Sequence, residues 1–190
     1  MKTITAIFMI FTSLTLFSQT YNAEFQKGKW KIGKEKVIKQ NRITRLEGKN
    51  NGSAITNIYY ETLEQSIENL RRTAGKEMWL QEKLDRLINA SKEVAIGGNI
   101  HILIKRPTID AANMEHISII IKDSEDKEEL FRKDFESVIP SIPASNSKLW
   151  SNYEIQVINK DLGDSFNVYI IDKLGFYSTG KYKFLVRTGI

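Results

Sequence analysis

The sequence predicts a mainly β protein of the α+β class, in which a short helical segment precedes a C-terminal antiparallel β-sandwich. After residue 98, apolar side chains alternate with polar ones in short runs, which is the period of half-buried strands. Between residues 57 and 97, apolar side chains instead recur every three or four positions, as in an amphipathic helix. Turn-forming residues rather than helices separate the later runs, so neighbouring strands are expected to pair antiparallel.

The chain begins with the layout of a secretory signal peptide at residues 1–18. Lys2 precedes a nearly unbroken apolar run over residues 3–17, and Ser18 provides a small residue for cleavage. The run is about 15 residues long, whereas a helix that spans a bilayer needs about 20. We therefore expect a secreted or periplasmic protein with no transmembrane span in its mature chain; the alternative is an uncleaved N-terminal anchor.

Cysteine is absent from the chain. This excludes disulfides, thiolate nucleophiles, cysteine-based zinc sites and a lipidated cysteine. An exported domain without disulfides must be stabilised by its packed core. The abundance of Lys, Ile and Asn favours a bacterial source.

Positive charge is concentrated in the basic segment, residues 19–56. The chain carries a formal charge of +5, and residues 24–60 alone hold nine basic and three acidic side chains. We expect this segment to be flexible or in part a strand, at residues 42–48, before the turn signal at 50–52. The favoured interpretation of this segment is an ordinary solvated face; because export argues against nucleic acid, the alternative is contact with an anionic envelope surface, a glycan or a protein. The predicted contact residues are Lys27, Lys29, Lys31, Lys34, Lys36, Lys39, Arg42 and Arg45.

Residues 57–97 are predicted to form one or two amphipathic helices. Apolar side chains share one helical face at positions 63, 67, 70 and 74, and a second stripe runs over positions 80–95. An interruption is expected at residues 73–75. Gly97 and Gly98 signal the end of the segment.

Five strong strands are predicted in the sandwich domain, residues 98–190, at 100–105, 116–122, 153–158, 166–171 and 182–187, with a weaker strand at 130–135. The apolar residues expected to face the core are Ile100, Ile102, Ile104, Ile117, Ile119, Ile121, Tyr153, Ile155, Val157, Phe166, Val168, Ile170, Tyr182, Phe184 and Val186. This architecture is similar to that of immunoglobulin-like and C2-like domains, and no motif in the sequence separates the two.

The opposite, outer faces of these strands are not uniformly polar. One apolar residue per strand is predicted there: Leu103, Ile120, Ile158, Ile171 and Leu185. We expect the helical segment to cover the resulting patch, because an amphipathic helix needs a surface against which to bury its apolar face. A patch left open would instead mark a partner-binding surface.

Histidines and loop carboxylates are the candidates for metal binding. His101 and His116 are predicted on outer strand faces, where Glu115 or Asp110 could complete a site. Such sparse spacing is more typical of ordinary surface or helix-covered histidines, so no metal site is predicted. In C2-like domains, clustered loop carboxylates hold calcium, but aspartate is also typical of turns. We therefore predict no cofactor, with calcium as the alternative; its candidate ligands are Asp110, Asp161, Asp164, Asp172 and the acidic run at 123–129.

The sequence contains no recognisable catalytic motif. There is no GxSxG, and no serine stands in a recognisable relation to a histidine. We predict an exported, non-catalytic binding or accessory protein. The alternatives are a C2-like, calcium-assisted membrane-binding domain and a hydrolase of unrecognised type, which would need a deep pocket that unites His101 or His116 with a carboxylate.

Overall fold

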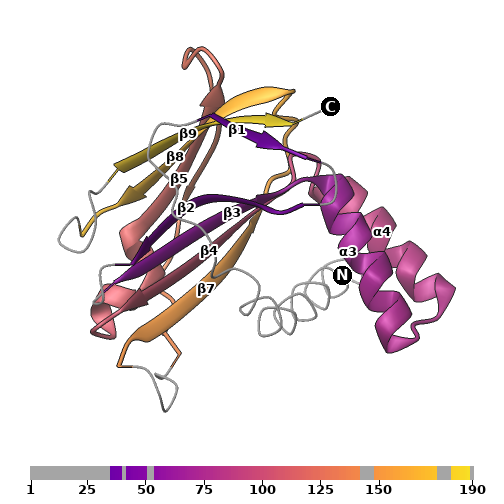
Figure 1. Ribbon diagram of the computed structural model, residues 1–190, viewed down its shortest axis with the longest axis horizontal. Coiled ribbons are helices and arrows are strands. Elements are labelled where there is room, and N and C mark those ends of the chain that lie inside the picture. Colours follow the sequence, from indigo (N-terminus) through magenta and orange to yellow (C-terminus); the bar gives the residue numbers. More distant parts are fainter. Residues whose placement is uncertain (1–34, 40–41, 51–53, 142–147, 175–180, 189–190) are drawn as a thin grey trace, which may run out of the picture.

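The computed structural model describes residues 35–39, 42–50, 54–141, 148–174 and 181–188. The predicted signal peptide at 1–18 and four predicted contact residues, Lys27, Lys29, Lys31 and Lys34, lie outside the described residues. The described chain is mainly β, as predicted, and its strands form two sheets that pack together (Figure 1). A hairpin of two helices stands between β3 and β4 in the chain.

Sheet A has five strands in the order β1-β9-β8-β5-β6, and sheet B has four in the order β2-β3-β4-β7. The strands of sheet A are β1 (Glu35–Ile38), β5 (Ile117–Asp123), β6 (Glu129–Asp134), β8 (Ser165–Asp172) and β9 (Lys181–Thr188). The strands of sheet B are β2 (Thr44–Asn50), β3 (Ile55–Glu61), β4 (Asn99–Arg106) and β7 (Trp150–Val157).

Three of these strands precede the helices and join the same sheets as the strands that follow them. The strand expected at residues 42–48 corresponds to β2. β1 pairs in parallel with β9, whereas the other described strand pairs are antiparallel, so the expectation of a purely antiparallel arrangement is wrong at this edge. Alternation of apolar and polar residues within a strand indicates which side chains are buried. It does not indicate which distant strand pairs with that strand.

The core lies between the inner faces of the two sheets. The predicted alternation is confirmed in β4, β5 and β8, and in the described side chains of β9. The core residues that these strands supply are Ile100, Ile102, Ile104, Ile117, Ile119, Ile121, Phe166, Val168, Ile170, Phe184 and Val186. β3 adds Ile58 and Tyr60, and the Tyr60 ring meets the Phe166 ring edge-on with 5.3 Å between centroids.

β7 faces the opposite way from the prediction. Its register places Glu154 beside Ile102 and Gln156 beside Ile100, and directly paired residues share a face of a sheet. β7 is an edge strand of sheet B, so polar side chains on its inner face can still reach solvent at that edge of the sheet. Ile158, expected on the outer face, is fully buried in the core instead. The residues wrongly expected in the core lie on the outer face of sheet B: Tyr153, Ile155 and Val157.

This inversion predicts that Glu154 destabilises the fold at neutral pH. Desolvation raises the pKa of the Glu154 carboxyl, while the positive charge of Lys133 acts to lower it. A carboxyl with a pKa raised by folding stabilises the folded state most at low pH, and this contribution is lost as pH rises through the folded pKa. Glu154→Gln is therefore expected to raise the melting temperature at about pH 7 and to leave it unchanged at about pH 3.

The matched control for Glu154→Gln is Glu125→Gln, because the Glu125 side chain is exposed. That substitution should shift the melting temperature little at either pH. Identical melting temperatures for Glu154→Gln and the unmodified protein at neutral pH would show that Glu154 carries no desolvation cost.

Two helices, α3 (Leu63–Glu77) and α4 (Gln81–Val94), form within the predicted helical segment 57–97, but its first residues, 57–61, belong to strand β3 instead. α3 begins with a capping box: the Gln65 amide N–H donates to Thr62 Oγ1 at 3.3 Å, and the Thr62 N–H donates to Gln65 Oε1 at 2.9 Å. The helix passes through Gly75 without a break. It ends at Met78, whose φ of 54° is left-handed, beyond the interruption expected at 73–75.

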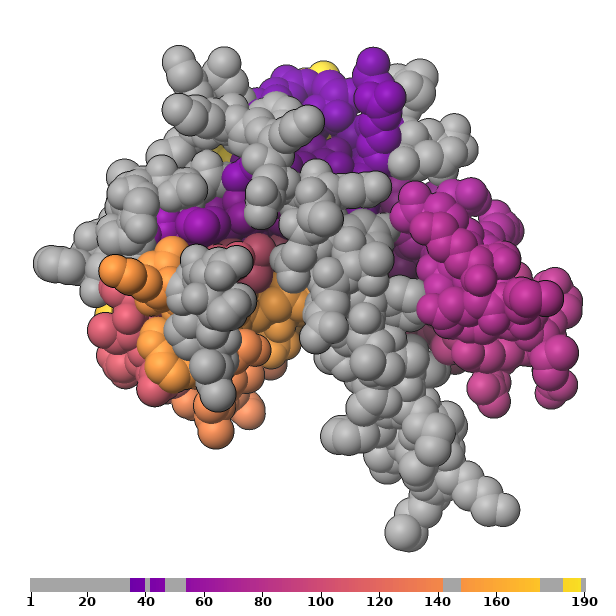
Figure 2. Space-filling view, turned by 60° about the horizontal axis from the view of Figure 1, so that its bottom comes forward, coloured from indigo at the N-terminus to yellow at the C-terminus, as the bar shows by residue number. Residues whose placement is uncertain are grey.

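The helical hairpin projects from one end of the sheets and leaves the outer face of sheet A uncovered (Figure 1). Figure 2 shows the hairpin as a separate lobe beside the strands. The two helices pack on each other, so their apolar stripes do not depend on a sheet face for burial. The expected helical cover is therefore not formed over sheet A. Neither described helix is long and apolar enough to cross a bilayer.

Candidate functional site

The outer face of sheet A carries a half-buried apolar strip. Cross-strand pairing sets Ile120 of β5 beside Tyr169 of β8, and Ile171 and Leu185 lie diagonal to that pair. These four residues, which we call the apolar strip, all retain part of their exposure. The outer face of a two-sheet protein meets water and is ordinarily polar, so an apolar strip on it needs an explanation.

A pocket of about 210 Å³ opens beside the strip. Ile120 and Tyr169 line it together with three charged residues, Lys122, Glu129 and Arg132. Arg132 binds Glu129 through two hydrogen bonds, with Nε donating to Oε1 at 2.9 Å and the second guanidinium nitrogen donating to Oε2 at 2.7 Å. This pairing raises the pKa of Arg132 and lowers that of Glu129. The pocket thus joins an apolar surface to a charged rim.

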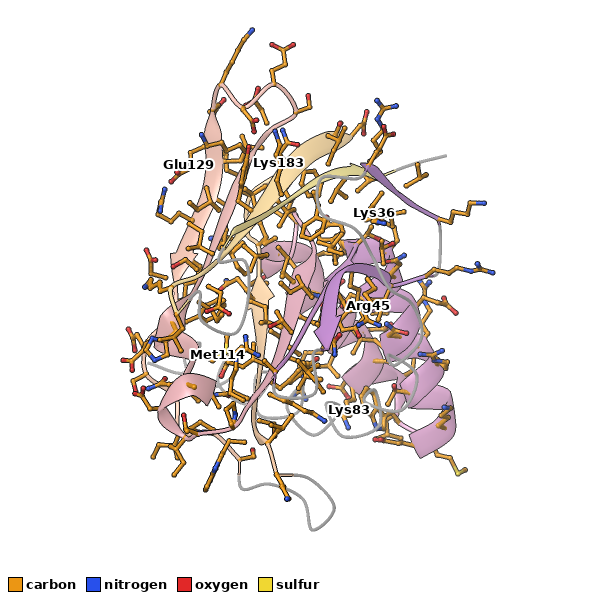
Figure 3. All side chains as sticks on the ribbon, turned by 60° about the vertical axis from the view of Figure 1, so that its left-hand side comes forward. Lys36, Arg45, Lys83, Met114, Glu129 and Lys183 are labelled. Carbon is orange, nitrogen blue, oxygen red and sulfur yellow. The ribbon has the colours of Figure 1, made fainter. Side chains whose placement is uncertain are left out.

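A second polar group borders the strip next to Tyr169. Lys183 pairs with Asp126, and its ammonium lies 5.3 Å from the centroid of the Tyr169 ring. The Asn167 amide donates to Asp126 Oδ1 at 3.0 Å and to the carbonyls of Asp123 and Ser124, also at 3.0 Å. Hydrogen bonding to Lys183 lowers the pKa of Asp126 and raises that of Lys183. These bonds fix the β5–β6 turn at the same end of sheet A as Glu129 (Figure 3).

The structure separates the two histidines. His101 lies on the outer face of sheet B, beside Tyr59 and Ile155. His116 lies in a short 3₁₀ helix, Met114–His116, immediately before β5 of sheet A. The hypothesis of a histidine pair therefore fails. His116 does lie near both proposed carboxylates, Asp110 and Glu115.

His101 belongs to a buried network that connects α3 to sheet B. Its Nδ1 lies 2.6 Å from the Tyr153 hydroxyl, and its Nε2 lies 3.2 Å from Glu61 Oε2. Asn69 of α3 donates to the other Glu61 oxygen, and Asn99 donates to Glu61 Oε2 at 3.4 Å. A hydroxyl, an imidazole and a carboxylate in this order could pass a proton. Since Glu61 and His101 are both nearly inaccessible, the network is better suited to holding the helix.

The same outer face of sheet B holds Arg45, the last of the predicted contact residues. Arg45 donates to the Asn57 side chain and lies near Tyr59, whose pKa burial raises to about 12 although the charge of Arg45 acts to lower it. Lys36 is buried, with 6% of its surface exposed, and both residues are marked in Figure 3. Lys39 and Arg42 are the exposed members of the predicted contact set among the described residues.

Two of the loop aspartates proposed for calcium, Asp161 and Asp172, are engaged in a turn and an ion pair. Asp161 accepts from the Gly163 N–H at 2.8 Å, and Asp172 binds Arg106 in the interior at 2.9 Å. The Asp164 carbonyl accepts from the Thr188 N–H at 3.0 Å. Within the described residues, one group of three or more potential ligands has its ligand atoms within 4.8 Å of one another: Asp110, Glu115 and His116.

Sequence reasoning found part of the apolar strip but not the pocket. Ile120, Ile171 and Leu185 were predictable as outer apolar positions because each breaks the alternation of its strand. Lys122 and Arg132 come from two strands, and nothing in either strand alone indicates that they meet. No protein-family model, no curated protein and no solved structure matches this chain.

Proposed function

We propose that the protein is an exported, non-catalytic binding module that docks a protein partner through the apolar strip and its pocket. The observation that carries the proposal is an apolar strip on an outer sheet face that neither of the described helices, α3 and α4, covers (Figure 1). An apolar surface with a charged rim is the usual anatomy of a protein-binding site. The signal-peptide pattern at residues 1–18 supports export to the periplasm or the cell exterior.

The pocket suggests what the partner presents. Its apolar wall, formed by Ile120 and Tyr169, suits an apolar side chain, and Arg132 is already neutralised by Glu129. Lys122 then provides a positive charge beside that wall. We infer a partner surface with an apolar side chain flanked by a carboxylate. Attraction through the exposed charges around the pocket should weaken as salt increases. Lys39 and Arg42 lie elsewhere, beside α3, where their backbone carbonyls accept hydrogen bonds from the Gln65 side chain.

The finer fold assignment is also a proposal. Two packed sheets support an immunoglobulin-like or C2-like sandwich. The immunoglobulin-like alternative is favoured, because Asp161 and Asp172 are used for a turn and an ion pair rather than gathered for calcium. A calcium-assisted membrane-binding domain would need such a gathered site.

The proposal is tested with an apolar-to-charged substitution in the strip, Ile120→Glu. The probe is 8-anilinonaphthalene-1-sulfonate, an aromatic anion that combines both features inferred for the partner. The native protein is expected to bind it with increased fluorescence, and Ile120→Glu is expected to weaken binding by at least about tenfold, because one buried charge costs more than 1.4 kcal/mol. Cross-linking to envelope extract should then capture a partner that Ile120→Glu fails to capture.

Leu80→Glu is the matched control. Leu80 is an apolar residue with 78% exposure in the turn between α3 and α4 and does not line the pocket, so its replacement should leave both probe binding and partner capture unchanged. Melting curves establish that both variants are folded. If folded Ile120→Glu binds the probe and captures partners as the unmodified protein does, the outer face of sheet A is not the docking surface.

A further inference from the structure

The geometry points to a binding site for a divalent transition-metal ion, formed by Asp110, Glu115 and His116. Each residue offers one ligand atom, and these atoms lie within 4.8 Å of one another. His116 Nε2 is 3.9 Å from Asp110 Oδ1 and 3.9 Å from Glu115 Oε1. Both distances are too long for hydrogen bonds, so the imidazole faces two carboxylates without bonding to either.

The free nitrogen of His116 is the second observation. Nε2 is almost inaccessible to solvent and has no hydrogen-bond partner. Buried polar atoms in folded proteins nearly always have a partner, and an ion is one of the explanations for an exception. An ion between the three side chains would give the nitrogen a partner and would offset the repulsion between the two carboxylates.

The backbone around the three residues is firmly held. Asp110 begins a 3₁₀ helix, Asp110–Ala112, and the adjacent Ala112 and Met114 are fully buried at the end of the sheets away from the helical hairpin (Figures 1 and 3). The Lys173 N–H donates to the His116 carbonyl at 2.8 Å. A short, anchored segment therefore presents all three side chains from one place, which limits the conformational entropy lost on binding.

Asn113 orients one of the carboxylates. Its side-chain amide donates to Glu115 Oε1 at 2.8 Å, and its Oδ1 accepts from the Glu115 N–H at 3.3 Å and the Val138 N–H at 2.9 Å. Outer partners of this kind fix the direction of a metal-binding carboxylate. Glu115 is thus positioned before any ion binds.

Positive side chains do not neutralise the two carboxylates. Lys173 directs its ammonium to the Glu115 carbonyl at 3.0 Å and lies 3.8 Å from Asp134. No lysine or arginine in the described part of the chain lies within 4 Å of a carboxylate oxygen of Asp110 or Glu115. The negative charge at the site remains available for a cation.

The ligand set selects the class of ion. An imidazole with two carboxylates suits Zn²⁺ and related transition ions, whereas calcium and magnesium prefer oxygen ligands alone. Tetrahedral zinc with bonds of about 2.0–2.1 Å places its ligand atoms about 3.3 Å apart. The two distances from His116 Nε2, 3.9 Å each, would therefore shorten by about 0.6 Å when zinc binds. The Asp110 side chain is 84% exposed and free to supply that movement. Three protein ligands leave a fourth position open to water or to an exogenous group.

Calorimetric titration of the full exported chain, purified without a histidine tag, with Zn²⁺ tests the site. One ion per chain is expected to bind, and Co²⁺ should give the visible absorption bands of a tetrahedral or five-coordinate site. His116→Gln and Asp110→Asn should each weaken Zn²⁺ binding at least about tenfold, as loss of a ligand does. Because Asp110 is exposed, Asp110→Asn remains informative even if His116→Gln folds poorly.

His101→Gln and Glu125→Gln are the controls. His101 is the other of the two histidines in the chain, and Glu125 is an exposed acid in another turn. Both variants should bind Zn²⁺ as the unmodified protein does. Absence of stoichiometric Zn²⁺ binding, or unchanged affinity in folded Asp110→Asn and His116→Gln, would overturn the assignment.

Discussion

Replacement of Arg106 by methionine is expected to lower the free energy of unfolding by about 3–5 kcal/mol. Arg106 of β4 is 1% exposed and pairs at 2.9 Å with Asp172 of β8, so this ion pair joins sheet B to sheet A. Its guanidinium also donates to the Ile55 carbonyl at 2.6 Å and to Thr56 Oγ1 at 2.7 Å. Methionine would fill much of the space but would leave the buried Asp172 carboxylate without its counter-charge.

Chemical denaturation measures the loss of unfolding free energy in Arg106→Met, and Arg132→Met is the matched control. Arg132 also pairs with a carboxylate, that of Glu129, but both side chains are exposed, so its loss should cost less than about 1 kcal/mol. The double substitution Arg106→Met with Asp172→Leu should recover much of the lost stability, because it leaves no buried charge. If Arg106→Met costs no more than Arg132→Met, the buried pair does not connect the sheets energetically.

Gly98→Ala is expected to lower the free energy of unfolding by about 3 kcal/mol or more. The Gly98 φ is +80°, where an L side chain is strained, and a Cβ there would lie 2.4 Å from the Glu61 carbonyl oxygen. The Gly98 N–H donates to the Ala95 carbonyl at 2.8 Å and its carbonyl accepts from Ile158 at 3.0 Å. The backbone is therefore held from two sides and cannot move away.

Gly75→Ala is the opposite case and serves as the control for Gly98→Ala. Gly75 lies inside α3, and a Cβ added there meets nothing within 4 Å. Alanine should therefore stabilise the helix by about 0.5–1 kcal/mol. Thermal denaturation should move in opposite directions for the two variants. A small effect of Gly98→Ala would mean that the junction between α4 and β4 can rearrange.

The alternation of apolar and polar residues was enough to predict which side chains of the central strands face the core. Ile100 to Ile104 and Ile117 to Ile121 face the core as predicted, since central strands bury one face completely. β7 could not be predicted in the same way, because an edge strand can direct Glu154 inward at modest cost. The helix end at Gly97 and Gly98 was visible, but the close approach of Gly98 to β3 was not.

The two candidate sites also differ in how far the sequence could predict them. Asp110, Glu115 and His116 fall within seven consecutive residues, so their proximity was open to sequence reasoning even though the wrong histidine was added. The pocket on sheet A required the pairing of β5 with β6 and β8, which brings Ile120 beside both Arg132 and Tyr169. Such cross-strand neighbours are set by register, and register is a property of the pair of strands.

The parallel pairing of β1 with β9 has a consequence for the order of folding. Residues 35–38 find their strand partner only at residues 185–188, so most of the described chain must be synthesised before sheet A can be completed. Contacts between such distant segments carry a large loop-closure cost and slow the folding reaction. A chain emerging from the ribosome therefore stays incompletely folded until its last strand is available. Sheet A, whose edge strand β1 needs β9 as its partner, is therefore the last part of the described fold that can be completed.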